Sequence, residues 1–243
     1  MRALLQIEWL KLSRSLGVFL LSIGMPVLFF LIFSSTVQLD DPNLQRQFVQ
    51  SYMLTMTGFS MSGFALFTFP MMLAEDRNNN WLIFLQHSPL PMWKYYLSKI
   101  ARVFLCFLSS IIIVFSVGGL VRGVELTLAE WLIAALLLLL TSIVFLALGL
   151  LLVQFKSEQT MSIVANILYF VLAILGGSWM PIQVFPEWVQ KICHWMPSYH
   201  VNELVTTYAQ KGEFIWKSLL IVVAYAIIFL GVTLFINKKT ENQ

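Results

Sequence analysis

The stretch LAEWLIAALLLLLTSIVFLALGLLLV, residues 128–153, decides the kind of fold. About 20 apolar residues in a helix cross the roughly 30 Å of a bilayer's hydrocarbon core, and Glu130 is the only charged residue in this stretch. Five similar stretches accompany it: Leu16–Val37, Tyr52–Leu73, Leu97–Leu120, Thr160–Gly177 and Phe214–Ile236. The sequence therefore predicts an all-α polytopic membrane protein, with six transmembrane helices in a single domain over residues 1–243.

The composition supports the same class. Hydrophobic residues make up 59% of the chain and charged residues only 11%, whereas soluble domains carry about 25% charge. The formal net charge of +3 does not point to nucleic acid, because the basic residues gather at the ends of apolar stretches, where lipid headgroups are the expected partners. The two cysteines, Cys106 and Cys193, predict neither a disulfide framework nor a metal site.

The distribution of basic residues predicts the orientation. An even number of spans places both termini on one side, and that side then holds ten of the fifteen Lys and Arg residues. The opposite side holds five, against seven acidic residues. Because short cytoplasmic loops carry an excess of Lys and Arg, both termini are expected in the cytoplasm.

Residues 75–91 interrupt the apolar pattern between the second and third spans. The segment begins Glu75-Asp76-Arg77-Asn78 and ends in Ser88-Pro89-Leu90-Pro91. Asn78 is expected to cap a short helix through Trp81, Phe84 and Leu85, which the prolines then terminate. The sequence predicts a structured cytoplasmic hairpin on which a soluble partner could dock; an ordinary interfacial loop is the alternative.

Two other segments are neither spans nor solvated loops. In residues 1–15, Leu5, Trp9 and Leu12 follow a helical stripe, which predicts an interfacial helix in the inner leaflet; a simple topogenic leader is the alternative. Residues 178–208 are broken by Pro181, Pro186 and Pro197, with a helical stretch expected from Glu187. This second segment is expected to form an external re-entrant or interfacial helical segment.

No Asp, Glu, Lys, Arg or His lies in the middle of any span. Lys99 and Arg102 fall in the first turns of the third span, where long basic side chains can reach the interface. Ion-driven carriers normally need buried ionisable groups, so an ATP-independent secondary carrier is disfavoured. The sequence also has no Gly-x-x-x-x-Gly-Lys-Ser/Thr phosphate loop, so nucleotide hydrolysis is not expected on this chain.

The order of these features resembles a permease of the bacterial type 2 ATP-binding-cassette exporters, the ABC-2 type. The resemblance covers essentially the whole chain and rests on the leading helix, the six spans, the hairpin ending in Ser88-Pro89-Leu90, and the pattern Gly176-Gly177-x-x-Met180-Pro181 followed by Pro186-x-Trp188 and Met196-Pro197. It implies a connecting helix at residues 1–15, a coupling helix at residues 75–91 that contacts a separate ATPase, and outward-facing re-entrant helices before the last span.

The resemblance also implies the partners and the site residues. Two permease chains, identical or different, pair with two ATPase subunits that bind ATP and Mg²⁺; this chain binds no cofactor or metal and has no catalytic residue. The site residues that it implies fall into three sets. ATPase coupling is expected from Glu75, Asp76, Arg77, Asn78, Trp81, Phe84, Leu85 and Pro89. The substrate path is expected to include Thr55, Phe59, Met161, Asn166 and Tyr169. The external gate is expected to include Met180, Pro181, Phe185, Pro186, Trp188 and Pro197.

The resemblance further implies export across the bacterial plasma membrane. The 14% aromatic residues and 11 methionines suit an apolar or amphiphilic cargo such as a drug, antibiotic, peptide or lipid-like molecule, as in multidrug efflux. Such residues also fill any membrane bundle, and a polysaccharide or glycolipid cargo is the alternative. A membrane-embedded enzyme built on His194, His200, Glu187 and Glu203 is disfavoured, because the two histidines lack metal-ligand spacing and Pro197 interrupts the helix between them.

Overall fold

The computed structural model describes residues 8, 10, 16–87 and 91–241, and this part of the chain is helical with no β-strand. The elements in chain order are α2 (Leu16–Thr36), α3 (Pro42–Gly63), the π-helix η1 (Phe64–Thr68), α4 (Phe69–Asn78), α5 (Trp81–Gln86), α6 (Met92–Arg122), α7 (Leu128–Thr141), α8 (Ile143–Leu152), α9 (Glu158–Leu175), the 3₁₀ helix η2 (Ile182–Val184), α10 (Glu187–Cys193), α11 (Pro197–Lys211) and α12 (Trp216–Glu241).

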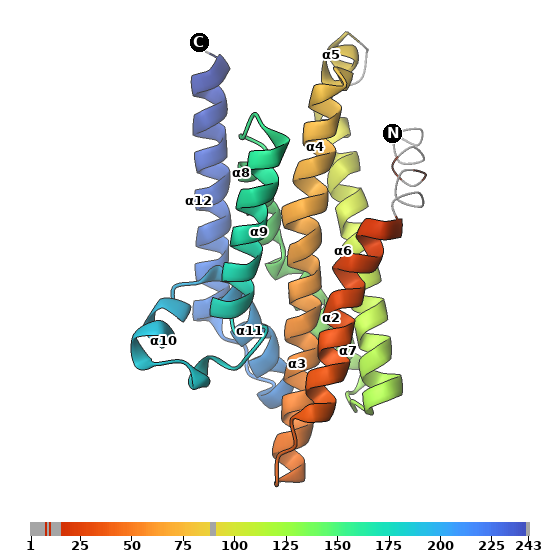
Figure 1. Cartoon of the computed structure of the whole chain (residues 1–243), viewed down its shortest axis with the longest axis vertical. Coiled ribbons are helices and arrows are strands. Elements are labelled where there is room, and N and C mark those ends of the chain that lie inside the picture. Colours follow the sequence, from red (N-terminus) through yellow and green to blue (C-terminus); the bar gives the residue numbers. More distant parts are fainter. Residues whose placement is uncertain (1–7, 9, 11–15, 88–90, 242–243) are drawn as a thin grey trace.

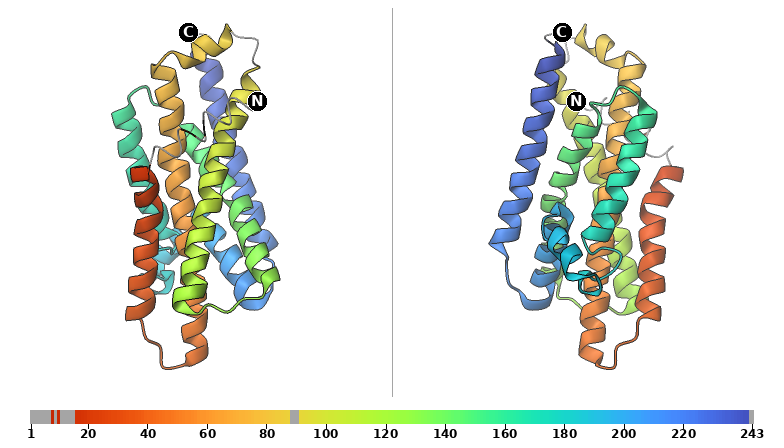
Figure 2. Two further views of the ribbon diagram at one scale, coloured as in Figure 1. Left: turned by 90° about the vertical axis from the view of Figure 1, so that its right-hand side faces the viewer. Right: turned by 60° about the vertical axis from the view of Figure 1, so that its left-hand side comes forward.

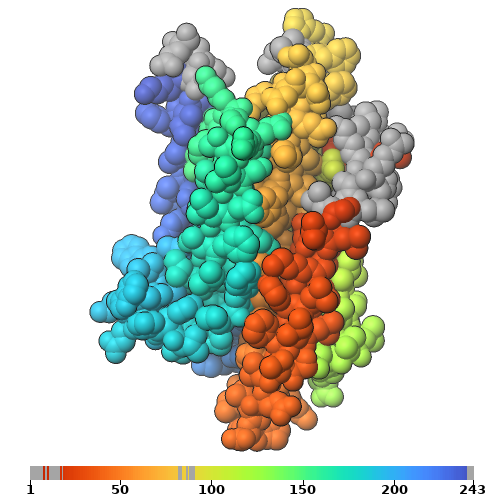
Figure 3. All heavy atoms as spheres, viewed as in Figure 1, coloured from red at the N-terminus to blue at the C-terminus, as the bar shows by residue number. Residues whose placement is uncertain are grey.

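The long helices form an antiparallel bundle (Figures 1 and 2). Within the described residues, six helices are long and apolar enough to cross a membrane, which confirms the predicted multi-pass helical architecture. The α4–α5 hairpin lies at the same end as the C-terminal end of α12, and α10 and α11 lie in the other half (Figure 1). In the space-filling view, the hairpin projects at one end of the molecule and the start of α3 at the other (Figure 3).

The second membrane helix is the centre of the bundle. Elements α3, η1 and α4 run without a break from Pro42 to Asn78, so this helix is longer than the predicted span Tyr52–Leu73. Its first turns are too polar to be recognised as part of a membrane span by hydropathy. They nevertheless have a clear helix N-cap. The side chain of Asp41 accepts a hydrogen bond from the backbone N–H of Asn43 at 2.8 Å, and Pro42 occupies the first turn.

A π-helical turn at Phe64–Thr68 lies in the middle of this central helix. Pro70 follows it, and a proline ring in a straight α-helix clashes with the carbonyl four residues earlier. In the wider turn, the N–H of Phe69 bonds to the carbonyl of Phe64, five residues back. The π-turn thus lets the helix accommodate Pro70, and such turns are frequent at functional sites.

Helix α8 packs directly against the π-turn at Gly149. A Cβ atom added at Gly149 would lie 2.1 Å from the carbonyl oxygen of Ala65, so only glycine permits this approach of two backbones. We expect Gly149→Ala to lower the stability by about 1–3 kcal/mol, measured as a lower thermal unfolding midpoint of the purified protein. Gly231→Ala in α12 is the matched control, since no atom lies within 4 Å of its Cβ position. Equal midpoints for the two variants would contradict this packing.

Candidate functional site

The α4–α5 hairpin is built at the end of the central helix. Helix α4 ends at Asn78, and Asn80 has a positive φ of 55°, a conformation that asparagine tolerates better than most residues. The N–H of Phe84 bonds to the carbonyl of Asn80 at 3.1 Å, which opens α5. The prediction of a short helix at Trp81–Leu85 is therefore confirmed. The expectation that Asn78 caps it is wrong, because Asn78 belongs to the last turn of α4.

The predicted ATPase-coupling residues divide by exposure. Phe84 is 64% exposed and stacks on Trp81 with ring centroids 5.3 Å apart, and Glu75 is also exposed. Leu85 is only 2% exposed and Asp76 only 3% exposed. These two side chains are therefore packed inside the protein and are not part of the surface of the hairpin. Pro89 lies outside the described residues. The surface that a partner could reach therefore centres on Phe84.

Arg77 and Asn78 tie the hairpin to the connection between α8 and α9. The guanidinium of Arg77 donates from Nη1 to the carbonyl of Val153 and from Nη2 to the carbonyl of Phe155, both at 3.0 Å. These bonds satisfy carbonyls at the C-terminal end of α8, which the helix itself leaves open. The side-chain amide of Asn78 donates to Glu158 in the first turn of α9. The hairpin is therefore bonded to the α8–α9 connection and to α9 as well as continuous with α4.

A buried charge cluster lies at the base of the hairpin. Lys99 Nζ lies 2.7 Å from Glu8 Oε1 and 2.6 Å from Asp76 Oδ2, and Arg102 Nη1 lies 3.0 Å from Glu8 Oε2. The Tyr95 hydroxyl donates to Asp76 Oδ2 at 2.9 Å. All four charged residues are at most 7% exposed, and their two positive and two negative charges balance. Burial of ions demands such compensation.

This cluster is the part of the site that sequence reasoning missed. Lys99 and Arg102 were expected to reach the interface, but Lys99 is 1% exposed and both point into the protein. Glu8, their shared partner, lies in the leading segment, of which only Glu8 and Leu10 are described; the predicted interfacial helix 1–15 otherwise lies outside the described residues. The available signal was the spacing of Tyr95, Lys99 and Arg102, which places the three on one face of α6.

Two of the predicted path residues line separate cavities. An outer cavity of about 360 Å³ is bordered by Thr55 with Tyr52 of α3, Asn202 of α11 and the Gly176–Gly177 turn. An inner cavity of about 270 Å³ is bordered by Met161 of α9 and by residues of η1 and α4. The predicted path residues Thr55 and Met161 thus border different cavities.

An aromatic stack lies between the two cavities. Phe59 and Tyr169 stack with ring centroids 4.4 Å apart, and Phe67 meets Tyr169 edge-on at 5.2 Å. Along the chain, Phe59 falls between Thr55 at the outer cavity and η1 at the inner cavity, and Tyr169 falls between Ala165 at the inner cavity and Gly176 at the outer cavity. Asn166, also predicted on the path, lies on the exposed face of α9 and donates to the carbonyl of Ser162. Along these two segments, the stack therefore separates the residues of one cavity from those of the other.

The segment predicted to be external folds as η2, α10 and α11. Of the predicted gate residues, Pro181 borders the outer cavity and Pro197 is buried in the first turn of α11. Trp188 is 67% exposed, Met180 and Pro186 are exposed, and Phe185 is partly exposed. Gly176 allows α11 to approach α9: a Cβ there would lie 2.3 Å from Ser198 Oγ, which donates to the carbonyl of Leu172. The segment is therefore packed onto the bundle at α11, with α10 left on its surface.

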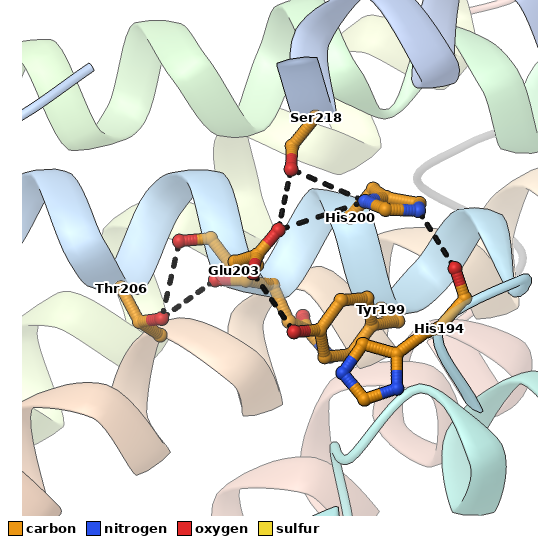
Figure 4. Close-up of polar contacts among 7 residues, drawn as sticks. His194, Tyr199, His200, Glu203, Thr206 and Ser218 are labelled. Atoms are coloured by element: carbon orange, nitrogen blue, oxygen red, sulfur yellow. Dashed lines mark hydrogen bonds and ion pairs between the residues drawn. The ribbon is translucent and has the colours of Figure 1, made fainter. Parts of the chain in front are cut away.

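A polar network joins α11 to α12, and the hydrogen bonds of His200 within it indicate the role of this histidine (Figure 4). His200 Nε2 lies 3.0 Å from the carbonyl of His194, an acceptor only, so this nitrogen donates. His200 Nδ1 lies 3.1 Å from Ser218 Oγ and 3.6 Å from Glu203 Oε2, and the Ser218 hydroxyl donates to the same carboxylate. Burial, and then the hydrogen bond that Tyr199 donates to Glu203, raise the pKa of Tyr199.

The network has the geometry of a structural tie. Both ring nitrogens of His200 are engaged, and Ser218 is only 1% exposed, so no substrate can reach the hydroxyl. Among the described residues, no group of three or more His, Cys, Asp or Glu side chains could hold a metal ion. Of the residues considered for an enzyme site, His200 and Glu203 therefore fix α11 against α12.

Comparison with known proteins agrees with this architecture. The family model described as "ABC-2 family transporter protein" matches residues 32–235. The chain is also 31% identical over 234 residues to a protein of Bacillus subtilis (strain 168) named "Putative transport permease YvfS", covering 96% of this chain and 95% of that protein. The chain therefore belongs to the ABC-2 family of transporter proteins, as a multi-pass membrane subunit for transport that is not itself an enzyme.

Proposed function

We propose that this chain is the permease of an ATP-driven exporter that moves an amphiphilic cargo out of a bacterial cell, with energy from a separate ATPase. The observation that carries the proposal is the projecting α4–α5 hairpin, which presents the aromatic Phe84 at 64% exposure. An exposed aromatic side chain on a projecting helix is a typical anchor for a protein partner. ATP and Mg²⁺ are bound by that ATPase in this scheme, and two permease chains pair with two ATPase subunits.

The contacts of the hairpin would transmit a displacement of α5 to the other helices. A displacement of α5 acts on α4, which continues through the π-turn into α3 as one helix of residues 42–78. The bonds of Arg77 carry the same displacement to the α8–α9 connection, and the ion pairs of Lys99 carry it to α6 and to Glu8. A docked ATPase would thereby move helices on both sides of the cavities.

The cavities supply a pathway with a barrier. In an alternating-access cycle the cargo enters the inner cavity, and the stack of Phe59 on Tyr169 opens when the hairpin moves α4 relative to α9. The cargo then reaches the outer cavity beside α11 and leaves past η2 and α10. This direction requires the hairpin and both termini to lie in the cytoplasm, which the excess of Lys and Arg at that side supports.

The decisive test combines the chain with a candidate ATPase in membrane vesicles. The two proteins are co-expressed, purified together and reconstituted, and we expect ATP-dependent movement of an amphiphilic dye such as rhodamine 6G, together with dye-stimulated hydrolysis. A catalytically inactive ATPase is the control, because it keeps the complex but removes the energy source. Dye transport by the permease without ATPase or ATP would contradict the proposal.

A further inference from the structure

Two residues that border the inner cavity each carry a polar atom that the protein leaves unsatisfied. Thr68 Oγ1 and Arg102 Nε are buried and have no hydrogen-bond partner in the part of the chain that is described. Both residues border this one cavity. An unsatisfied buried polar group is costly, and such groups in a native structure call for an explanation. Two such groups on residues that border one cavity point to a ligand that carries an oxygen.

Most of the remaining cavity wall is apolar. Its apolar members are Leu66, Phe67, Met71, Met72, Met161 and Ala165. Methionine side chains adapt to differently shaped ligands. A volume of about 270 Å³ lies near the lower end of the range for small-molecule sites, about 300–1,000 Å³. The cavity therefore fits a headgroup and the beginning of an apolar chain.

The charges around the cavity select the sign of the headgroup. The charge of Arg102 is already matched by Glu8, and Lys99 is held between Glu8 and Asp76, so an anionic head would meet no excess positive charge. Glu75 also borders the cavity, and none of the ion pairs among the described residues involves it. Its carboxylate favours a cationic group.

We propose that the inner cavity binds a cationic amphiphile whose head carries a carbonyl or hydroxyl oxygen. The oxygen meets Thr68 Oγ1 and the N–H at Arg102 Nε, the cation lies toward Glu75, and the chain lies along the methionines. Since Arg102 Nη1 also binds Glu8, the occupant contacts a member of the charge cluster directly. Calling this occupant the cargo rests on the proposed export function; the binding itself does not.

The test measures protection of a cysteine placed in the cavity. Ser162 borders the cavity and is partly exposed, while the natural Cys106 and Cys193 are both 0% exposed. The full chain carrying Ser162→Cys is placed in nanodiscs of phosphatidylglycerol, and its modification by N-ethylmaleimide is followed by mass. We expect lauroylcholine, a cation with an ester carbonyl, to slow the reaction at lower concentration than dodecyltrimethylammonium, which has no oxygen, or dodecyl sulfate, which is anionic.

Two further substitutions identify the polar contact. Thr68→Val keeps the shape but removes the hydroxyl, and it is expected to raise the lauroylcholine concentration for half-protection about tenfold. Thr68→Ser restores the hydroxyl and with it the protection. Thr233→Val is the matched control, since its hydroxyl bonds only within α12, to the carbonyl of Phe229 at 2.8 Å. Equal protection by the three amphiphiles, or an unchanged Thr68→Val variant, would overturn the proposal.

The ammonium and oxygen could also come from a bilayer lipid. Adding phosphatidylethanolamine to the nanodiscs distinguishes the sources: protection without a probe identifies the lipid as an occupant with the proposed chemistry, and protection only with lauroylcholine identifies a free amphiphile. ATPase association of the same variants is measured separately. Failure of protection with normal association rejects this site alone, whereas loss of association by the unmodified chain rejects the proposed function.

Discussion

In a Lys99→Met variant, we expect a loss of about 3–5 kcal/mol of stability, because removal of one partner from a buried ion network leaves uncompensated charge. Lys99 is 1% exposed and lies within 2.7 Å of a carboxylate oxygen of both Glu8 and Asp76. Methionine has a similar length but cannot neutralise either carboxylate. The measurement is the thermal unfolding midpoint of detergent-purified protein, together with the folded fraction in size-exclusion chromatography.

The charge balance of the cluster provides a rescue experiment. The double variant Asp76→Asn/Lys99→Met removes one charge of each sign and leaves the pair of Arg102 with Glu8, 3.0 Å apart, so it is expected to recover most of the lost stability. Lys94→Met is the matched control on the same helix, because Lys94 lies over the exposed ring of Trp93 at 5.6 Å. A double variant no more stable than Lys99→Met would mean that the lysine acts through its packing and not through its charge.

The cluster also marks the limit of prediction from sequence. The six spans and the short helix at Trp81–Leu85 follow from hydropathy and from helix-breaking residues, which are local properties, and both were found. Pairing of charges is not local: Glu8, Asp76 and Lys99 come from three segments, and nothing in any one of them specifies the other two. Lys99 near the end of an apolar span is equally compatible with an interfacial position.

The central helix and the hairpin surface illustrate two other limits. Residues 42–51 are helical because of the capping by Asp41, although they are too polar to count as a span. In α5, Phe84 and Leu85 are adjacent apolar residues, and the helix is too short for periodicity to tell which one faces out. Only the packing decides that Leu85 is buried and Phe84 is exposed. The close approach of the π-turn to Gly149, at Ala65, is likewise a matter of packing.

A Phe84→Asp variant is expected to lose ATPase association. An aromatic anchor at a protein interface contributes about 2 kcal/mol or more, and aspartate also places a charge in the contact, so we expect the affinity to fall by at least about thirtyfold. The fold should be unaffected, because Phe84 is 64% exposed and its only described ring contact is with Trp81. The measurement is retention of the ATPase on the affinity-purified permease, with the unfolding midpoint recorded alongside.

Two further variants distinguish a loss of ATPase docking from a loss of the folded structure. Trp188→Asp alters a side chain of similar exposure, 67%, on the short helix α10 in the opposite half of the molecule, and it should retain the ATPase. Leu85→Asp should lower the unfolding midpoint, because Leu85 is buried at the base of α5, so any loss of association by that variant has a structural cause. If Phe84→Asp kept the ATPase while Trp188→Asp lost it, the docking surface would be at the other end of the molecule and the direction of transport assigned to the two cavities would be reversed.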